Sequence, residues 1–136
     1  MNAKEYLCSV QDKDNAITEQ KQHIEALRGV LESLGVSTDS ERVQSSSDYD
    51  KFGKIFGQID EEERRLEQME KDFLMFKVRV ITEIKQISDS RYRVLLYERY
   101  INYKSFKVIS VQMGYCYDYI LELHGDALKE FGSIPC

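Results

Sequence analysis

The residues whose types could support catalysis or metal binding are few and stand apart from one another. His124 lies in a different predicted unit from the only other histidine, His23, and has no partner at ligand spacing. The three cysteines, Cys8, Cys116 and Cys136, do not form a C-x-x-C pair of the kind that zinc and redox sites use. We therefore interpret His124 as a structural or solvent-exposed residue, Cys116 as a small buried residue, and the thiols as free.

The acidic run from Asp60 to Glu63 does not predict a metal site either. Consecutive positions of a helix point in different directions, so these carboxylates cannot converge on one ion. The sequence also contains no glycine-rich phosphate loop and no nucleophile paired with a base. We predict that the protein is not an enzyme, holds no metal or cofactor, and acts on no small-molecule substrate.

Charge and composition limit the partners and the location of the protein. The formal charge of −5, from 19 Lys and Arg against 24 Asp and Glu, opposes polyanion binding unless basic residues are concentrated somewhere. Apolar residues make up 42% of the 136 residues and there is one proline, which is typical of a soluble, helix-rich protein. No apolar run approaches the roughly 18 residues of a membrane span. We expect a cytoplasmic protein that does not contact membranes.

Two heptad stripes of apolar residues predict two long helices in the first two thirds of the chain. One stripe contains Val10, Ile17, Ile24 and Leu31, and the other contains Phe52, Ile59, Leu66, Phe73, Val80 and Ile87. They predict helices over about residues 4–34 and 51–87. The serine-rich segment at about 35–50 between them predicts a mobile loop.

The two stripes must be covered by each other, by a second copy of the chain, or by both. We favour a hairpin over residues 1–87 that also forms a homo-oligomer through these N-terminal helices. Ser88, Asp89 and Ser90 then break the heptad rhythm, and all three are good helix caps. Residues 88–136 are predicted to form a separate small helical domain, which gives an all-α protein.

Within this domain the spacing predicts helices over 91–101, 106–113 and about 116–131, with Ser105 as a cap. The two later helices match the spacing of a helix-turn-helix, because Gly114 can adopt a positive φ and Ser110 is small where the helices cross. A plain helical hairpin is the alternative. The predicted core of the helix-turn-helix is Phe106, Ile109, Ser110, Met113, Gly114, Tyr115, Ile120 and Leu123.

Three segments, 95–101, 106–115 and 124–128, resemble region four of sigma-70-type factors. They are still more similar to the small phage-encoded regulators of the ArpU/RinA type, which join an N-terminal helical segment to a C-terminal helix-turn-helix. The resemblance covers about residues 90–131 well and the long helices only in general character. It implies DNA binding near promoters or contact with RNA polymerase, and a phage protein in the cytoplasm of a bacterial host.

One departure from the family concerns the outer face of the last helix. Tyr117, Asp118 and Glu122 stand where the family commonly has basic or amide side chains, and carboxylates there oppose DNA binding. Tyr117 and Tyr119 are the pair we expect to be exposed for recognition. The candidate DNA-binding residues are Arg91, Arg93, Lys104, Ser105, Lys107, Tyr117, Tyr119 and Lys129.

The same departure supports an alternative of another class. A coiled-coil interaction or assembly protein could keep the shape of a helix-turn-helix and use its acidic, aromatic face to dock onto a protein. The sequence leaves both functions open.

Overall fold

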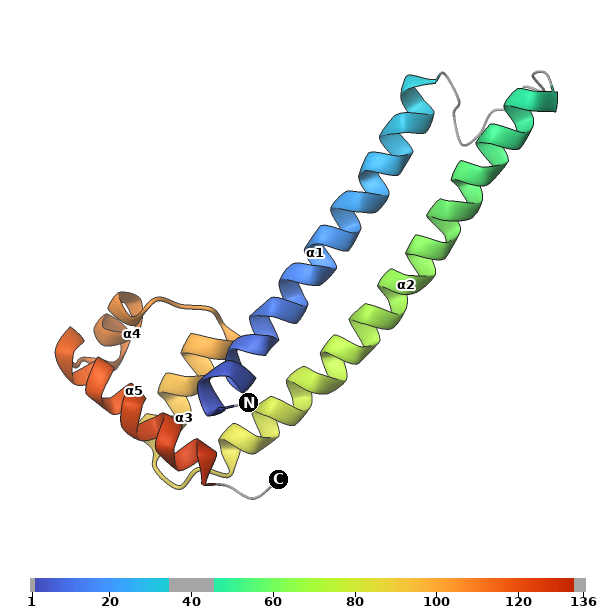
Figure 1. Cartoon of the computed structure of the whole chain (residues 1–136). Helices are drawn as coiled ribbons and strands as arrows, with labels where there is room; N and C mark the ends of the chain where they lie inside the picture. Colours follow the sequence, from blue (N-terminus) through green and yellow to red (C-terminus); the bar gives the residue numbers. More distant parts are fainter. Residues whose placement is uncertain (1, 35–45, 134–136) are drawn as a thin grey trace. The chain divides into compact units, whose positions relative to one another are not determined.

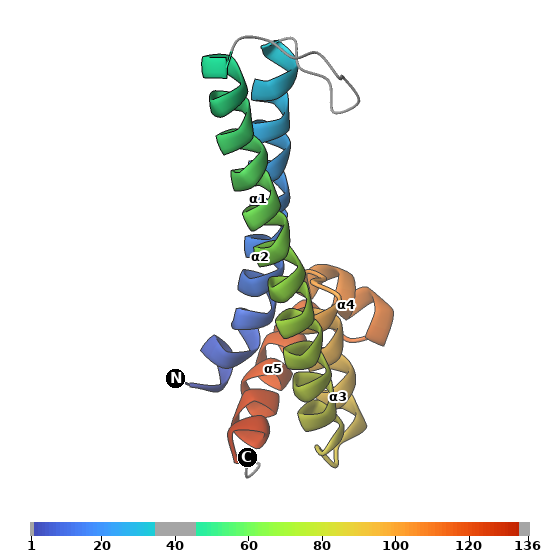
Figure 2. The same cartoon turned by 90° about the vertical axis from the view of Figure 1, so that its right-hand side faces the viewer.

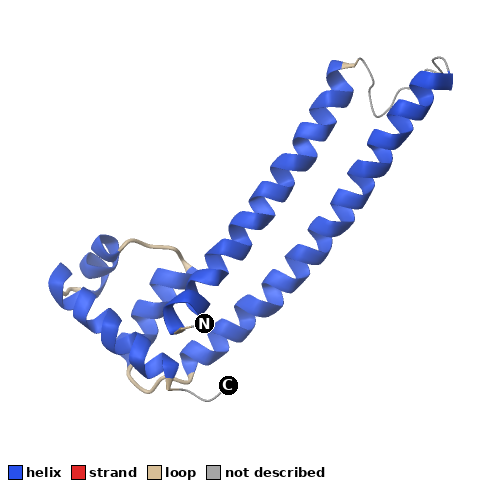
Figure 3. Cartoon of the chain, viewed as in Figure 1, coloured by secondary structure: helices blue, strands red, loops and turns tan. Residues whose placement is uncertain are grey.

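The computed structural model describes residues 2–34 and 46–133, and every regular element in these ranges is helical (Figures 1 and 3). The predicted all-α class is confirmed: two long helices pack as a hairpin and short C-terminal helices follow. The elements are α1 (Ala3–Ser33), α2 (Ser46–Lys85), α3 (Ser90–Leu96), a π-helical turn η1 (Tyr97–Ile101), α4 (Phe106–Met113) and α5 (Tyr117–Gly132). None of the described helices is long and apolar enough to cross a membrane.

The predicted heptad stripes form the buried faces of α1 and α2. All four residues of the first stripe are buried, and so are Ile59, Phe73, Val80 and Ile87 of the second, whereas Phe52 and Leu66 are half-buried. Apolar residues at this spacing share one face of a helix, so each helix can cover the other. Within residues 15–72, and again where residues 1–14 meet the end of α2, the segments of α1 and α2 lie side by side, as Figures 1 and 2 show.

Two compact units divide the chain: Met1–Asp14 with Phe73–Cys136, and Asn15–Asp72. Packing therefore groups the beginning of α1 and the end of α2 with the short C-terminal helices. The predicted domain boundary at residues 87 and 88 stays a prediction, because packing alone does not show which part of the chain folds or acts independently.

In the unit formed by residues 15–72, a core of Ile24, Leu31 and Ile59 lies between the two helices. Polar contacts run beside it. The Gln20 amide donates to the Glu62 carboxylate at 2.6 Å and to the Glu62 carbonyl at 3.0 Å. These bonds fix the register of α1 against α2 where the stripes alone would allow sliding.

In the other unit, aromatic contacts join the long helices to α5. The Tyr6 ring stacks on Phe131 at 6.0 Å between centroids and meets the edge of Phe76 at 5.5 Å. The beginning of α1 is capped by Asn2 and Glu5, each of which bonds the other's backbone N–H, as in a capping box.

The short helices begin and end at residues that local chemistry favours. Asp89 caps α3 by accepting from the Arg91 N–H at 2.9 Å, and Ser105 caps α4 by accepting from the Val108 N–H at 3.2 Å. The predicted helix over 91–101 is present as α3 followed by η1.

The predicted loop at about 35–50 needs one correction. Residues 35–45 lie outside the described residues, but α2 already begins at Ser46. Serine and aspartate are favoured in the first turn of a helix as well as in loops, so their presence did not separate the two.

Candidate functional site

The helices α4 and α5 are joined by a short turn and share a small core. Leu95 of α3, Ile109 of α4, and Ile120 and Leu123 of α5 form this core and are all buried. Tyr92, Phe106, Met113 and Tyr119 are half-buried against it. The core fixes α5 against α3 and α4 and leaves the other side of α5 in solvent.

Gly114 makes the turn between the two helices. Its φ is 74°, a left-handed value that glycine adopts without steric cost, and the Tyr115 N–H donates to the Ser110 carbonyl at 3.0 Å. The Ser110 side chain is 8% exposed, and its hydroxyl donates to the Lys107 carbonyl at 2.7 Å. Tyr115, predicted as a core position, is instead exposed at the turn, where its ring lies 4.9 Å from that of Tyr119.

Several of the predicted DNA-binding residues are occupied within the chain. The Arg91 guanidinium pairs with Asp89 at 2.8 Å and donates to the Tyr119 hydroxyl at 2.7 Å. Arg93 donates to the carbonyls of Ile87 and Ser88 at 2.6 and 2.8 Å. These contacts hold the junction between α2 and α3, so both arginines have a structural use.

A second ion pair joins Lys104 and Glu98 at 2.5 Å. It holds the pKa of the Glu98 carboxyl below its ordinary value, with the Lys104 hydrogen bond as the largest cause, and Arg91 does the same to the Asp89 carboxyl. Lys107 and Lys129 are exposed and form no ion pair with any described residue. They are the basic candidates that remain available to a partner.

The outer face of α4 and α5 is apolar and acidic. Val111 is 82% exposed, Tyr117 43% and Leu121 41%, beside the exposed carboxylates of Asp118 and Glu122. The predicted exposure holds for Tyr117, whereas Tyr119 is half-buried and bonded to Arg91.

The expectation that Cys116 is buried is wrong, because its side chain is exposed. It occupies the N-cap position of α5 without a side-chain hydrogen bond. A residue at this position precedes the first helical turn, so it escapes the periodicity that would place it against the core.

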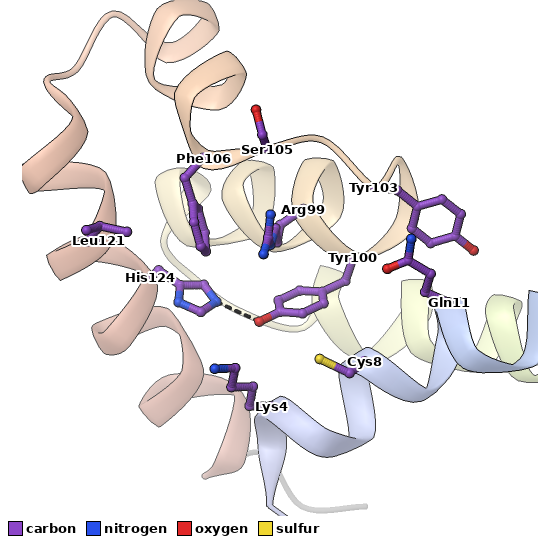
Figure 4. A pocket seen from close by; sticks show the side chains of 10 residues that line it. All are labelled: Lys4, Cys8, Gln11, Arg99, Tyr100, Tyr103, Ser105, Phe106, Leu121 and His124. Atoms are coloured by element: carbon purple, nitrogen blue, oxygen red, sulfur yellow. Dashed lines mark hydrogen bonds between the residues drawn. The ribbon is translucent and has the colours of Figure 1, made fainter. Parts of the chain in front are cut away.

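A cavity in the same unit, lined in part by Leu121, was missed at the level of sequence (Figure 4). It has a volume of about 500 Å³ and is lined by residues of α1, η1, α4, α5 and the segment before α4. Its lining combines residues near the beginning of the chain with others about a hundred positions later, which no local spacing could reveal.

His124 and Tyr100 form one wall of this cavity. The Tyr100 hydroxyl is hydrogen-bonded to His124 Nε2 at 2.7 Å, the two rings stack, and Phe106 meets the imidazole edge-on at 4.8 Å. Burial, reinforced by the charges of Arg99 and Lys4, lowers the pKa of His124 to about 4. Burial also raises the pKa of Tyr100 to about 12. Both groups are therefore neutral at physiological pH.

The cations of the cavity are Lys4 and Arg99. The Arg99 guanidinium lies 4.1 Å from the centroid of the Phe106 ring and donates to the Lys104 carbonyl at 3.2 Å. No carboxylate lines this cavity. Among the described residues no group of three metal-ligating side chains occurs, here or elsewhere.

Comparisons of the chain with protein-family models, with curated proteins and with solved structures give no significant match. What the protein does must therefore be inferred from its own surfaces and cavity.

Proposed function

We propose that this chain is a phage-type regulator of transcription that acts by bringing the outer face of α4 and α5 into contact with RNA polymerase, DNA or both. The observation that carries the proposal is the arrangement of α4, Gly114 and α5 on a shared core, which leaves one side of α5 free. Helix-turn-helix proteins use such a pair to present the second helix to a partner.

The charges on this face favour RNA polymerase as the partner. Phosphate groups would meet the carboxylates of Asp118 and Glu122, and Arg91 and Lys104 are already paired within the chain. An exposed tyrosine and leucine between carboxylates suit a protein surface that offers apolar and basic groups.

The test is binding of the full chain to purified RNA polymerase of the bacterial host. Tyr117→Ala should weaken this binding at least about tenfold, because truncation of a central aromatic residue commonly has an effect of that size. Tyr97→Ala is the matched control, since Tyr97 is 37% exposed on η1, outside the proposed face. Equal loss in both variants, or no binding by the unmodified chain, would contradict polymerase contact through this face.

Direct DNA binding is the second candidate, favoured by Lys107 and Lys129, which are exposed and form no ion pair with a described residue. A band shift with phage promoter fragments at roughly 50 mM salt tests it, because phosphate contacts are strongest at low salt. Lys107→Ala should then weaken binding to all sequences, and Tyr117→Ala should change sequence preference. The absence of any shifted band removes this candidate.

An assembly role outside transcription would use the same face. It predicts that the chain binds another phage protein through Tyr117 while purified RNA polymerase fails to bind. The polymerase and DNA measurements together therefore separate the two roles.

A further inference from the structure

We propose that the cavity beside His124 binds a small organic phosphate of the size of a nucleoside monophosphate. The inference goes beyond the transcription proposal and does not depend on it, because the cavity's cations, Lys4 and Arg99, are not part of the proposed polymerase contact; Leu121 alone belongs to both.

The charges of the cavity are all of one sign. Lys4 and Arg99 line it, no carboxylate does, and neither cation forms an ion pair with a described residue. This differs from Arg28, Arg91 and Lys104, each of which is paired with a carboxylate. In a chain of net charge −5, two cations on one cavity, neither paired with a described carboxylate, favour an anion as its occupant.

The two cations both lie near His124. Both Arg99 and Lys4 disfavour the imidazolium form of His124, so their fields overlap at its ring. Figure 4 shows the Lys4 side chain directed toward the side of the cavity where His124 and Tyr100 meet. A phosphate bound in the cavity would accept charge-assisted hydrogen bonds from the cations that line it.

The backbone around the cavity adopts two uncommon conformations. Arg99 and Tyr100 belong to the π-helical turn η1, where the Asn102 N–H reaches back to the Tyr97 carbonyl at 3.2 Å. Tyr103, which also lines the cavity, has a φ of 59°, a left-handed value that is rare for a bulky residue. π-Helical turns and such outliers cluster at functional sites, because the surrounding structure must keep them in place.

The size and the apolar lining of the cavity indicate that the anion carries an organic group. A volume of about 500 Å³ lies in the range of small-molecule pockets and far exceeds what a free phosphate fills. Phe106, Tyr103 and Leu121 offer apolar surface, and the Ser105 hydroxyl and Gln11 amide offer hydrogen bonds to a ring or sugar.

The test is titration calorimetry of the full chain with AMP at low salt, compared with adenosine and with inorganic phosphate. We expect saturable AMP binding with a dissociation constant below about 1 mM, and at least about tenfold weaker binding of both comparison compounds. No saturable binding of AMP overturns the proposal. Equal affinities for AMP and inorganic phosphate would overturn the inference that the ligand carries an organic group.

Two variants connect the binding to the cavity. Lys4→Gln and Arg99→Gln should each weaken AMP binding at least about tenfold, because each removes one charge-assisted contact. Lys85→Gln, which removes an exposed lysine outside the cavity, should leave the affinity unchanged. Arg99 packs on Phe106 and its variant could fold poorly, so the exposed Lys4 decides the outcome. Unchanged AMP affinity in Lys4→Gln, with a normal melting curve, overturns the proposal.

Discussion

At the scale of single residues, His124 is the group whose environment differs most from water. Its imidazole is stacked on Tyr100, touches Phe106, and lies in the field of Arg99 and Lys4, with the Cys8 thiol near Tyr100. Burial and the charges of Arg99 and Lys4 all favour the neutral imidazole over the imidazolium. Protonation of His124 is therefore coupled to unfolding.

We expect the free energy of unfolding to fall as the pH drops from about 6.5 to about 4. In this window the unfolded chain binds a proton at His124 and the folded chain does not, since its folded pKa is about 4. The loss should not exceed about 3 kcal/mol, because one pKa unit corresponds to roughly 1.4 kcal/mol. Urea unfolding at several pH values measures it.

His124→Gln should remove most of this dependence between about pH 6.5 and 5.5, above the range in which Asp and Glu carboxyls protonate. The matched control is His23→Gln, because His23 is exposed on α1. A pH dependence that stays the same in His124→Gln would contradict the assignment.

Gly114 supplies a second residue-scale prediction. Gly114→Ala should lower the free energy of unfolding by roughly 1–2 kcal/mol, because an alanine at a φ of 74° is strained. Gly125→Ala in the exposed part of α5 should instead raise it by up to about 1 kcal/mol, since nothing obstructs the added Cβ and alanine favours helix. Thermal melting compares the two, and equal effects would be inconsistent with the turn geometry.

Residue identity predicted local features better than tertiary ones. Gly114, Ser105 and Asp89 have the positions expected of them because turns and caps depend on a few neighbouring backbone atoms. The burial of Tyr119 and the exposure of Cys116 were not predictable in this way. They depend on Arg91 reaching across from α3 and on the place of Cys116 before the first turn of α5.

At the scale of elements, the heptad stripes of α1 and α2 predicted both helices and their pairing. The predicted limits differ from the observed ones by a few residues, mostly where the chain is rich in serine. The π-helical turn η1 carried no comparable signal. Its sequence, Tyr97 to Ile101, has ordinary helical spacing, which does not distinguish hydrogen bonds to the fifth preceding residue from those to the fourth.

The two faces of α2 can be compared with one type of substitution. Val80→Ala should reduce the free energy of unfolding by roughly 1–3 kcal/mol, because Val80 is fully buried and its loss leaves a cavity. Val78→Ala should change it by less than about 0.5 kcal/mol, because Val78 is 63% exposed. Denaturant unfolding followed by circular dichroism measures both. A larger effect at Val78 would mean that this face is covered.

At the scale of the whole molecule, the sequence could not predict the cavity. Lys4, Arg99 and His124 come from separate helices, and their meeting depends on tertiary packing that has no periodic signature. The surface of α4 and α5 was easier to predict, because its residues lie within one stretch of about thirty positions. The ion pairs that occupy Arg91 and Lys104 were again visible only in three dimensions.

Self-association through the long helices remains a proposal. Ile24, Leu31 and Ile59 of the two stripes share one core and the other stripe residues are buried or half-buried, so a second copy would need other apolar residues. Leu74, Met75 and Val78 offer such a surface on α2, with exposed fractions of 59%, 75% and 63%. Light scattering during gel filtration should give the mass of a dimer, and Met75→Glu should restore the monomer. A monomer at all concentrations would exclude the proposal.

The capping box formed by Asn2 and Glu5 has a consequence for the cavity. Helix ends fray readily, and this one carries Lys4 between the two capping residues. Each time the first turn of α1 opens, the cavity loses one of its two cations. An occupant held by Lys4 would slow that opening, so amide hydrogen exchange at the very start of the chain should report on a ligand bound nearly a hundred residues further along.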